Sequence, residues 1–390
     1  MTRVAASIMH GAMSDRLGVL DGLRGIAVLL VLWYHVWEIS WYPAPFAWLQ
    51  FVPETGFIGV HLFFFLSGFV ITYPFVRALA AGTPQPAWMH FAWRRFIKIM
   101  PSYALSIAIA YAIGYAAVVR WGTTPWQEIW THALFVHTWW PQTYGSINGV
   151  LWTLAVEVEF YAIFPLVWWC FRRNAILTWL SMVLFAFAWR AYAAHCCATT
   201  SLPLLSENLP GYLDILGSGM LCAWLFVQHG ARIRASRAFA LMPALAIAGI
   251  AALAVLMQWS YAQRLEPNWE VASQVSTRAL FGIAFGAIAF GSLCAPSLWQ
   301  RLFANAPLKF LAIISYNLYL YHQMIAREMV RLRLPPYVGR DPHFDPHWQF
   351  WFTMLAFAAT IGIAAAVTYG FERPLLRLRD PRLVAPQIGH

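Results

Sequence analysis

The chain has 390 residues, of which 61% are hydrophobic and only 11% are charged. A water-soluble globule of this size lacks the polar side chains to cover so much apolar surface, which excludes a soluble protein. The net charge of +10 comes mainly from arginine. Apolar runs recur along nearly the whole chain with no long polar block between them, so we expect one polytopic membrane domain.

We expect about ten transmembrane helices, because each crossing takes about 20 predominantly apolar residues. The qualifying segments are 23–41, 57–79, 96–118, 148–171, 175–194, 210–228, 238–258, 276–295, 308–326 and 348–371. The stretch 120–147 is aromatic but only partly apolar, with Trp121, Trp126, Trp130, Trp139 and Trp140. Such a stretch fits an interfacial or re-entrant segment, so the expected fold class is an all-α membrane protein carrying one.

The basic residues predict the orientation in the membrane. If the N-terminus is cytoplasmic, 18 of the 26 Lys and Arg residues, including Arg3, Arg16, Arg379 and Arg382, lie on the cytoplasmic side. This matches the positive-inside rule with both termini in the cytoplasm, and it explains the basic charge without nucleic acid as a partner. The exception is an outer loop with Arg327, Arg331, Arg333 and Arg340, which either contacts anionic headgroups or an acidic acceptor, or reveals a miscounted span.

We therefore divide the chain into a cytoplasmic N-terminal segment at 1–22, a transmembrane domain at 23–371 and a cytoplasmic tail at 372–390. The segment 1–22 has no long apolar core or small-residue cleavage site, unlike a removable signal peptide. The cysteines lack metal or redox spacing, so we expect neither a disulfide framework nor a metal site. These are Cys170, Cys196, Cys197, Cys222 and Cys294.

Ionisable residues within apolar spans are costly and usually functional. Arg24 and His35 lie eleven residues apart, which places them on nearly the same face of one helix and about 16 Å apart along its axis. A guanidinium at the membrane surface suits a phosphate-bearing ligand, and a buried neutral imidazole can act as a general base. The alternative is that Arg24 anchors the topology and His35 is a hydrogen-bonded core histidine.

A second basic cluster, Arg94, Arg95 and Lys98, falls on one helical turn. Three cations at a helix start could clamp several phosphates, or could simply flank a membrane span.

In the second span, Gly59 and Gly68 are predicted to permit close approach of another helix. Ser67 can act as a polar donor or simply bond a backbone carbonyl, and His61 can be a headgroup histidine.

Glu157 and Glu159 lie within the fourth span and point to different sides of the helix, so they do not form a shared-proton pair. Each needs its own partner or must be protonated. We favour a catalytic or substrate-facing role for at least one of them over a structural ion pair.

Three further polar residues lie in later spans. Asp214 and Arg278 are expected to pair with each other or to lie near the outer surface. His322 is either a ligand contact or a packed core residue.

Six ordered blocks, spread over essentially the whole chain, resemble the acyltransferase 3 family of integral-membrane acyltransferases. They are Leu20-Asp21-Gly22-Leu23-Arg24 through His35; Gly59-Val60 with Phe63-Phe64 and Ser67-Gly68-Phe69; Arg94-Arg95 with Lys98 and Pro101; Leu151-Trp152-Thr153-Leu154 with Glu157 and Phe160-Tyr161; Ser315-Tyr316 with Leu318-Tyr319-Leu320-Tyr321-His322; and Glu372-Arg373-Pro374.

The resemblance implies a ten-helix enzyme that moves an acyl group, usually acetyl, from cytoplasmic acyl-CoA to a hydroxyl of a carbohydrate-containing acceptor such as a surface polysaccharide, glycolipid or secreted glycoside. It implies a multi-pass protein of the bacterial inner membrane that needs no tightly bound cofactor. On this interpretation His35 is the general base, Glu157 orients it or lines the acceptor side, and the residues for the CoA phosphates are Arg24, Arg94, Arg95 and Lys98. The remaining substrate-pocket residues are Ser67, Trp152, Tyr161, Tyr321 and His322.

The chain departs from the family pattern at three positions. The family commonly has arginine at Lys98, an aromatic residue at Met100 and a second acid at Val158. Lysine keeps the charge but loses bidentate phosphate recognition. Val158 weakens any mechanism that needs adjacent acids, and we expect the transfer to be completed within the membrane domain.

Two other functional classes stay open. A proton-coupled transporter would use His35, Glu157 and His322 as a relay. An inactive relative would bind acyl-CoA or lipid as a sensor. Direct transfer and a short-lived acyl-enzyme are equally compatible with the sequence, because no residue stands out as a nucleophile.

Overall fold

The computed structural model describes residues 3–115, 124–197, 202–266, 273–337, 339 and 341–377, without the side chains of 3–17, 197, 202, 203, 273 and 274. These residues form helices and no strand. Several residues used above lie outside the description: Trp121, Arg340, Arg379, Arg382 and the side chains of Arg3, Arg16 and Cys197.

Each of the ten predicted spans is found as a long helix. These helices are α1 (Arg3–Ser40), α3 (Ile58–Ala81), α4 (Trp88–Ala112), α7 (Trp152–Phe171), α8 (Ala175–Cys197), α10 (Leu209–Arg234), α11 (Met242–Gln263), α13 (Arg278–Cys294), α15 (Ala306–Arg331) and α16 (Pro346–Val367). The first of them begins at Arg3, so the N-terminal segment continues directly into the first span.

Eight helical stretches in the described part of the chain are long and apolar enough to cross a membrane. Helices α4 and α15 are as long, with 25 and 26 residues, but are less apolar. In α15, Lys309, Arg327, Glu328 and Arg331 lower the mean hydropathy. The fold class of an all-α membrane protein is confirmed, and the count of ten stays a prediction.

Short elements connect the long helices. They are η1 (Ala47–Leu49), α2 (Phe51–Glu54), α6 (Pro125–Ala133), η2 (His137–Trp139), η3 (Gly149–Leu151), α9 (Leu202–Ser206), η4 (Arg237–Leu241), the π turn η5 (Ser273–Thr277), α14 (Ser297–Phe303), the π turn η6 (Thr368–Glu372) and α17 (Arg373–Leu376). The aromatic stretch from residue 124 is thus a short helix and 3₁₀ turns, not a span, as predicted.

Helix starts follow ordinary capping chemistry. The side chain of Asn305 accepts a hydrogen bond from the backbone N–H of Leu308 (3.0 Å), and that of Asp345 accepts one from His347 (2.9 Å). Pro346 occupies the first helical position of α16 and Pro307 the second position of α15, where the missing N–H costs nothing.

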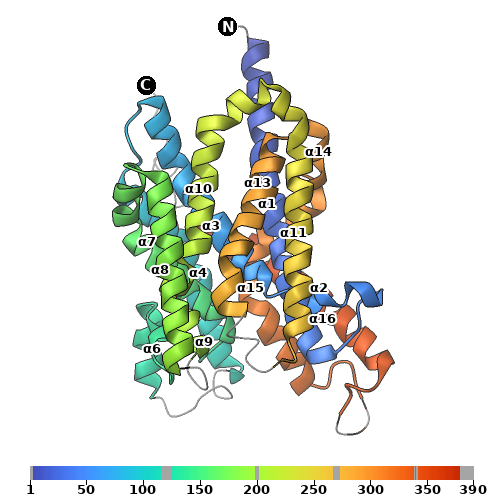
Figure 1. Cartoon of the computed structure of the whole chain (residues 1–390). Coiled ribbons are helices and arrows are strands. Elements are labelled where there is room, and N and C mark those ends of the chain that lie inside the picture. Colours follow the sequence, from blue (N-terminus) through green and yellow to red (C-terminus); the bar gives the residue numbers. More distant parts are fainter. Residues whose placement is uncertain are drawn as a thin grey trace, which may run out of the picture.

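Helix α10 lies at the centre of one side of the bundle and packs against α3, α8 and α13, while α1 packs against α15 and α3. Figure 1 shows α8 and α11 on the outside of the bundle, and α6 and α9 at the end opposite the N-terminus. Large apolar side chains of α8 and α11 are exposed, including Leu184 and Val255. In a membrane these side chains face lipid.

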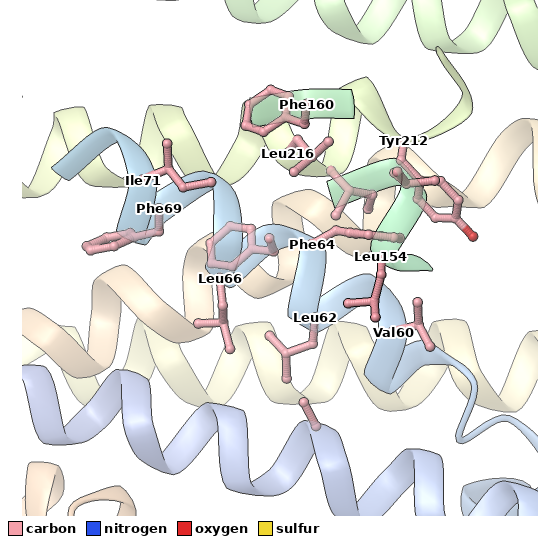
Figure 2. Close-up of a cluster of buried hydrophobic side chains, with 14 of the residues drawn as sticks. Val60, Leu62, Phe64, Leu66, Phe69, Ile71, Leu154, Phe160, Tyr212 and Leu216 are labelled. Carbon is pink, nitrogen blue, oxygen red and sulfur yellow. The ribbon is translucent and has the colours of Figure 1, made fainter. Parts of the chain in front are cut away.

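Aromatic and aliphatic side chains of α3, α7 and α10 form a dense core (Figure 2). Phe64, Leu154 and Leu216 are all buried there, and the ring of Phe64 lies 4.5 Å from that of Tyr212. Glycines let α3 and α10 approach closely enough for this packing. A Cβ on Gly68 would lie 2.1 Å from the carbonyl oxygen of Leu216, and one on Gly219 would lie 2.0 Å from that of Phe65. The predicted packing role of Gly68 is confirmed.

Candidate functional site

A cavity of about 470 Å³ opens between α1, α3, α4, α7 and α15. Its walls combine cations, aromatic rings and one carboxylate: Arg24, Ser67, His90, Phe91, Arg94, Arg95, Lys98, Thr153, Glu157, Tyr161, Ser315, Tyr316 and Tyr319 are among the lining residues. The four basic residues predicted for phosphates therefore line one space. Residues of the first five sequence blocks all line this cavity, although the blocks are far apart in the chain.

Arg95 is held on the cavity wall by aromatic rings. Its guanidinium carbon lies 5.5 Å from the centre of the Phe91 ring and 5.4 Å from that of Tyr161. Arg94, on the same turn of α4, is exposed. Stacking orients the Arg95 guanidinium and leaves its N–H groups available for an anion.

Lys98 differs from the arginines because its ammonium forms an ion pair with Glu372. Glu372 is buried on the π turn η6, and its other oxygen accepts a hydrogen bond from the Asn317 amide at 2.5 Å. The same amide donates to the Thr368 hydroxyl at 2.9 Å. Lys98 thus ties α4 to η6 and, through Asn317, to α15, a role that its position in the sequence did not indicate.

Glu157 accepts two hydrogen bonds at one oxygen. The Ser67 hydroxyl donates to Oε1 at 2.6 Å, and the Tyr161 hydroxyl donates to the same atom. Glu159 has a separate partner, the Trp139 indole N–H at 2.6 Å. The two acids do not share a proton, as predicted, and each has its own partner. Ser67 is committed to Glu157 in this arrangement.

His35 and His322 form a pair outside the cavity lining. The Nε2 atom of His322 lies 3.1 Å from Nδ1 of His35, and Nδ1 of His322 lies 2.7 Å from the carbonyl oxygen of Tyr319. His35 Nδ1 also lies 3.0 Å from the carbonyl oxygen of Val31. His322 is fully buried, whereas His35 is only half-buried.

One side chain connects the cavity with this histidine pair. Tyr319 lines the cavity, and its ring lies 5.6 Å from the ring of His322. Its hydroxyl accepts a hydrogen bond from Thr153 at 3.0 Å, and its ring packs at 6.0 Å from Phe63, another cavity residue. Neither histidine lines the cavity itself. Tyr319 therefore lies between the predicted base, His35, and the basic residues predicted to bind phosphates.

Three of the residues predicted for the substrate pocket, Trp152, Tyr321 and His322, lie outside the cavity lining. Trp152 packs on Phe64 and Tyr212, and Tyr321 is buried. His61 is buried among the rings of Phe57, Tyr212 and Phe281, and is not a headgroup residue.

The expected pairing of Asp214 with Arg278 is wrong. Asp214 pairs with Arg190 of α8 at 2.7 Å, and both side chains are fully buried. Arg278 instead donates to the carbonyl oxygen of Ser206 at 2.5 Å and stacks 4.1 Å from the Tyr212 ring. The missed signal was Arg190 itself, a lone cation within an apolar segment, which required a buried acid.

Sequence reasoning named the blocks containing Tyr316, Tyr319 and Glu372 but gave these residues no role. The Tyr316 hydroxyl donates to the carbonyl oxygen of Ile99 at 2.8 Å, so it joins α15 to α4 at the cavity wall. Among the residues that the structure describes, no three His, Cys, Asp or Glu side chains gather as metal ligands would.

Comparison with known proteins identifies the family to which this arrangement belongs. The family model described as an acyltransferase domain matches residues 17–369, which include the cavity and the histidine pair. The chain belongs to the acyltransferase 3 family. The resemblance drawn from the six sequence blocks is confirmed.

The individual relatives of this chain are distant. The chain is 24% identical to the peptidoglycan O-acetyltransferase OatA of Listeria monocytogenes, over 91% of its own length and 55% of the relative's. It is 29% identical to the acyltransferase MdmB of Streptomyces mycarofaciens over half of each chain, and 23% identical to nodulation protein 10 of Rhizobium leguminosarum over 95% of each. The chain thus spans only about half the length of two of these relatives. No solved structure matches it significantly.

Proposed function

We propose that this acyltransferase moves an acyl group, most simply acetyl, from cytoplasmic acyl-CoA to a hydroxyl of a carbohydrate-containing acceptor, with His35 as the general base. The observation that carries the proposal is the cavity, in which Arg24, Arg94 and Arg95 line one space that Tyr319 separates from His35 and His322.

The cavity suits a donor with a charged head and a less polar arm. Coenzyme A carries phosphates, which arginines bind through charge-assisted hydrogen bonds. Phe63, Phe64 and Val70 supply apolar wall for the pantetheine arm. His35 lies about 16 Å from Arg24 along α1, because eleven residues each rise about 1.5 Å. In this arrangement the phosphates stay at the basic end, and the thioester passes Tyr319 to reach His35.

The chemistry needs a base, and His35 has the atoms for it. Its Nε2 atom takes the proton from the acceptor hydroxyl as that oxygen attacks the thioester carbonyl carbon. The C–S bond then breaks, and the imidazolium returns its proton to the departing thiolate of CoA. The acyl ester and free CoA are the products.

Orientation and acceptor follow from charge and from the relatives. The basic residues around the cavity favour a cytoplasmic location for this end, with both termini on the same side, under the positive-inside rule. The name of the Listeria relative, a peptidoglycan O-acetyltransferase, supports a carbohydrate-containing acceptor. A surface polysaccharide, a glycolipid or a secreted glycoside has the hydroxyl that this chemistry requires.

The direct test is transfer of label from radiolabelled acetyl-CoA into glycan and lipid extracts of membranes. Membranes with the wild-type protein should incorporate label, and those with a folded His35→Ala variant should not. Mass spectrometry of the labelled product then identifies the acceptor. Full transfer by a folded His35→Ala variant contradicts base catalysis by His35, and absence of both transfer and acyl-CoA binding contradicts the donor.

A further inference from the structure

The hydrogen-bond chain through His322 determines where the protons of both imidazoles lie. His322 Nδ1 lies 2.7 Å from the carbonyl oxygen of Tyr319. A carbonyl oxygen only accepts, so Nδ1 must carry the ring proton. The neutral His322 ring then presents a lone pair at Nε2.

That lone pair faces His35. Nε2 of His322 lies 3.1 Å from Nδ1 of His35, and two lone pairs at this distance would repel each other. Nδ1 of His35 must therefore carry a proton, which the carbonyl oxygen of Val31 at 3.0 Å also requires. Both neighbours demand the same tautomer, which leaves the lone pair of His35 on Nε2.

The Nε2 atom of His35 is free to accept a proton. It makes no hydrogen bond to the described residues, and it is absent from the buried polar atoms without a partner, so it keeps accessible surface. A base needs this combination, a free lone pair with access to its substrate.

We infer that His322 is a positioning residue, which holds His35 in the Nδ1–H tautomer and stabilises the imidazolium that forms when Nε2 takes a proton. The inference rests on the proposed role of His35 as the base. The carbonyl oxygen of Val31 alone would favour the same tautomer of His35. The specific contribution of His322 is therefore to stabilise the charged imidazolium of His35. Hydrogen bonds from a charged donor are roughly twice as strong as neutral ones, so the bond to His322 strengthens as the reaction proceeds.

The fold supports this role. His322 is fully buried on α15, the helix that packs along α1. The centre of its ring lies 5.6 Å from that of Tyr319 and 4.8 Å from that of His35. A buried, hydrogen-bonded ring has little freedom to turn, which fixes the direction of the acceptor atom.

A matched pair of substitutions tests the inference. His322→Gln and His322→Met have side chains of equal length, and only glutamine offers an oxygen acceptor near the position of Nε2. In purified protein with acetyl-CoA and the labelled acceptor, His322→Met should lower kcat by about 100-fold and leave the KM for acetyl-CoA unchanged. His322→Gln should recover activity to within about tenfold of the wild type. Met324→Leu, another buried substitution on α15, is the control for packing.

The outcomes separate this inference from the proposed function. Equal loss in the Gln and Met variants, or a change in KM alone, overturns the positioning role of His322 while His35→Ala still lacks activity. Should the Met variant not fold, His322→Phe keeps a buried ring without an acceptor and takes its place against Gln. An inactive wild-type protein, or an active His35→Ala variant, instead overturns the base assignment.

Discussion

Arg95 is a cavity cation that two aromatic rings hold in place. Its guanidinium lies over the rings of Phe91 and Tyr161, while Lys98 of the same helix is paired with Glu372. Two cations on one turn of α4 thus have different contacts. The family pattern places an arginine where this chain has Lys98, and the ion pair gives the lysine a structural use.

Removal of the Arg95 guanidinium should weaken donor binding more than turnover. A charge-assisted hydrogen bond contributes about 1.5–3 kcal/mol, so we expect Arg95→Ala to raise the KM for acetyl-CoA by about 10- to 100-fold with little change in kcat. Arg77→Ala is the matched control, because Arg77 also stacks on a ring, that of Tyr73, but does not line the cavity. A larger effect in the control than in Arg95→Ala would contradict the assignment.

The ion pair of Lys98 with Glu372 should contribute to stability. Loss of one partner leaves the other charge poorly compensated in a buried site, at a cost of about 2 kcal/mol. Lys98→Met and Glu372→Gln should each lower the melting temperature in detergent. The melting temperature of the double variant should fall by less than the sum of the two single decreases, since the double variant leaves no unpaired charge. Strict additivity would show that the pair does not couple.

At the scale of elements, the packing of α3 on α10 depends on the absence of side chains at two glycines. Gly219→Ala would place a Cβ 2.0 Å from the Phe65 carbonyl oxygen, and backbone atoms cannot turn away as a flexible side chain can. We expect the free energy of unfolding to fall by about 1–3 kcal/mol or more. The measurement is the fraction of protein that stays monodisperse after heating, which should be reduced.

The control for this substitution is Gly286→Ala in α13. A Cβ there meets no atom within 4 Å, and alanine has the better helix propensity, so the variant should be neutral or slightly more stable. Equal loss in both variants would show that the α3–α10 contact is not the cause.

The short segment around α6 should make stability depend on pH. Burial lowers the pKa of His132 and lowers that of His137 well below its ordinary value, and their rings stack at 4.0 Å. A lowered pKa in the folded protein means that the unfolded chain binds more protons. The stabilising contribution is therefore complete above about pH 6.5 and is lost as the pH falls toward the folded values.

Melting temperatures between pH 7.5 and pH 5 measure this dependence. His137→Phe, which keeps a buried ring without a titrating group, should flatten the decrease. The exposed His195→Gln should leave it as in the wild type. An unchanged slope in His137→Phe would exclude the buried histidine as its source.

For the whole molecule, sequence reasoning found the elements because hydrophobic length alone indicates a membrane span. All ten segments are helices, although α4 and α15 are less apolar. It also singled out Arg24, Arg95 and Glu157, which line the cavity, and His35, which does not. Sequence reasoning could not find the contacts between residues that are far apart in the sequence.

The missed contacts join residues with no local relation in sequence. His35 and His322 are 287 positions apart, and Lys98 and Glu372 are 274 apart. A pair of Asp214 with Arg278 was one of two alternatives predicted, but the partner of Asp214 lies on α8, because the arginine that faces an acid is determined by helix rotation and packing. Tyr319 likewise shows its place between the cavity and the histidines only in three dimensions.

The proposed reaction requires a donor that binds at the basic end of the molecule and reacts through His35. The most direct measurement supplies labelled acetyl-CoA to only one face of sealed inverted or right-side-out membrane vesicles. Label should enter the acceptor only when acetyl-CoA has access to the cytoplasmic face, and only with wild-type protein rather than His35→Ala. Equal labelling from both faces, or from the outer face alone, would contradict the account, as would undiminished labelling by His35→Ala.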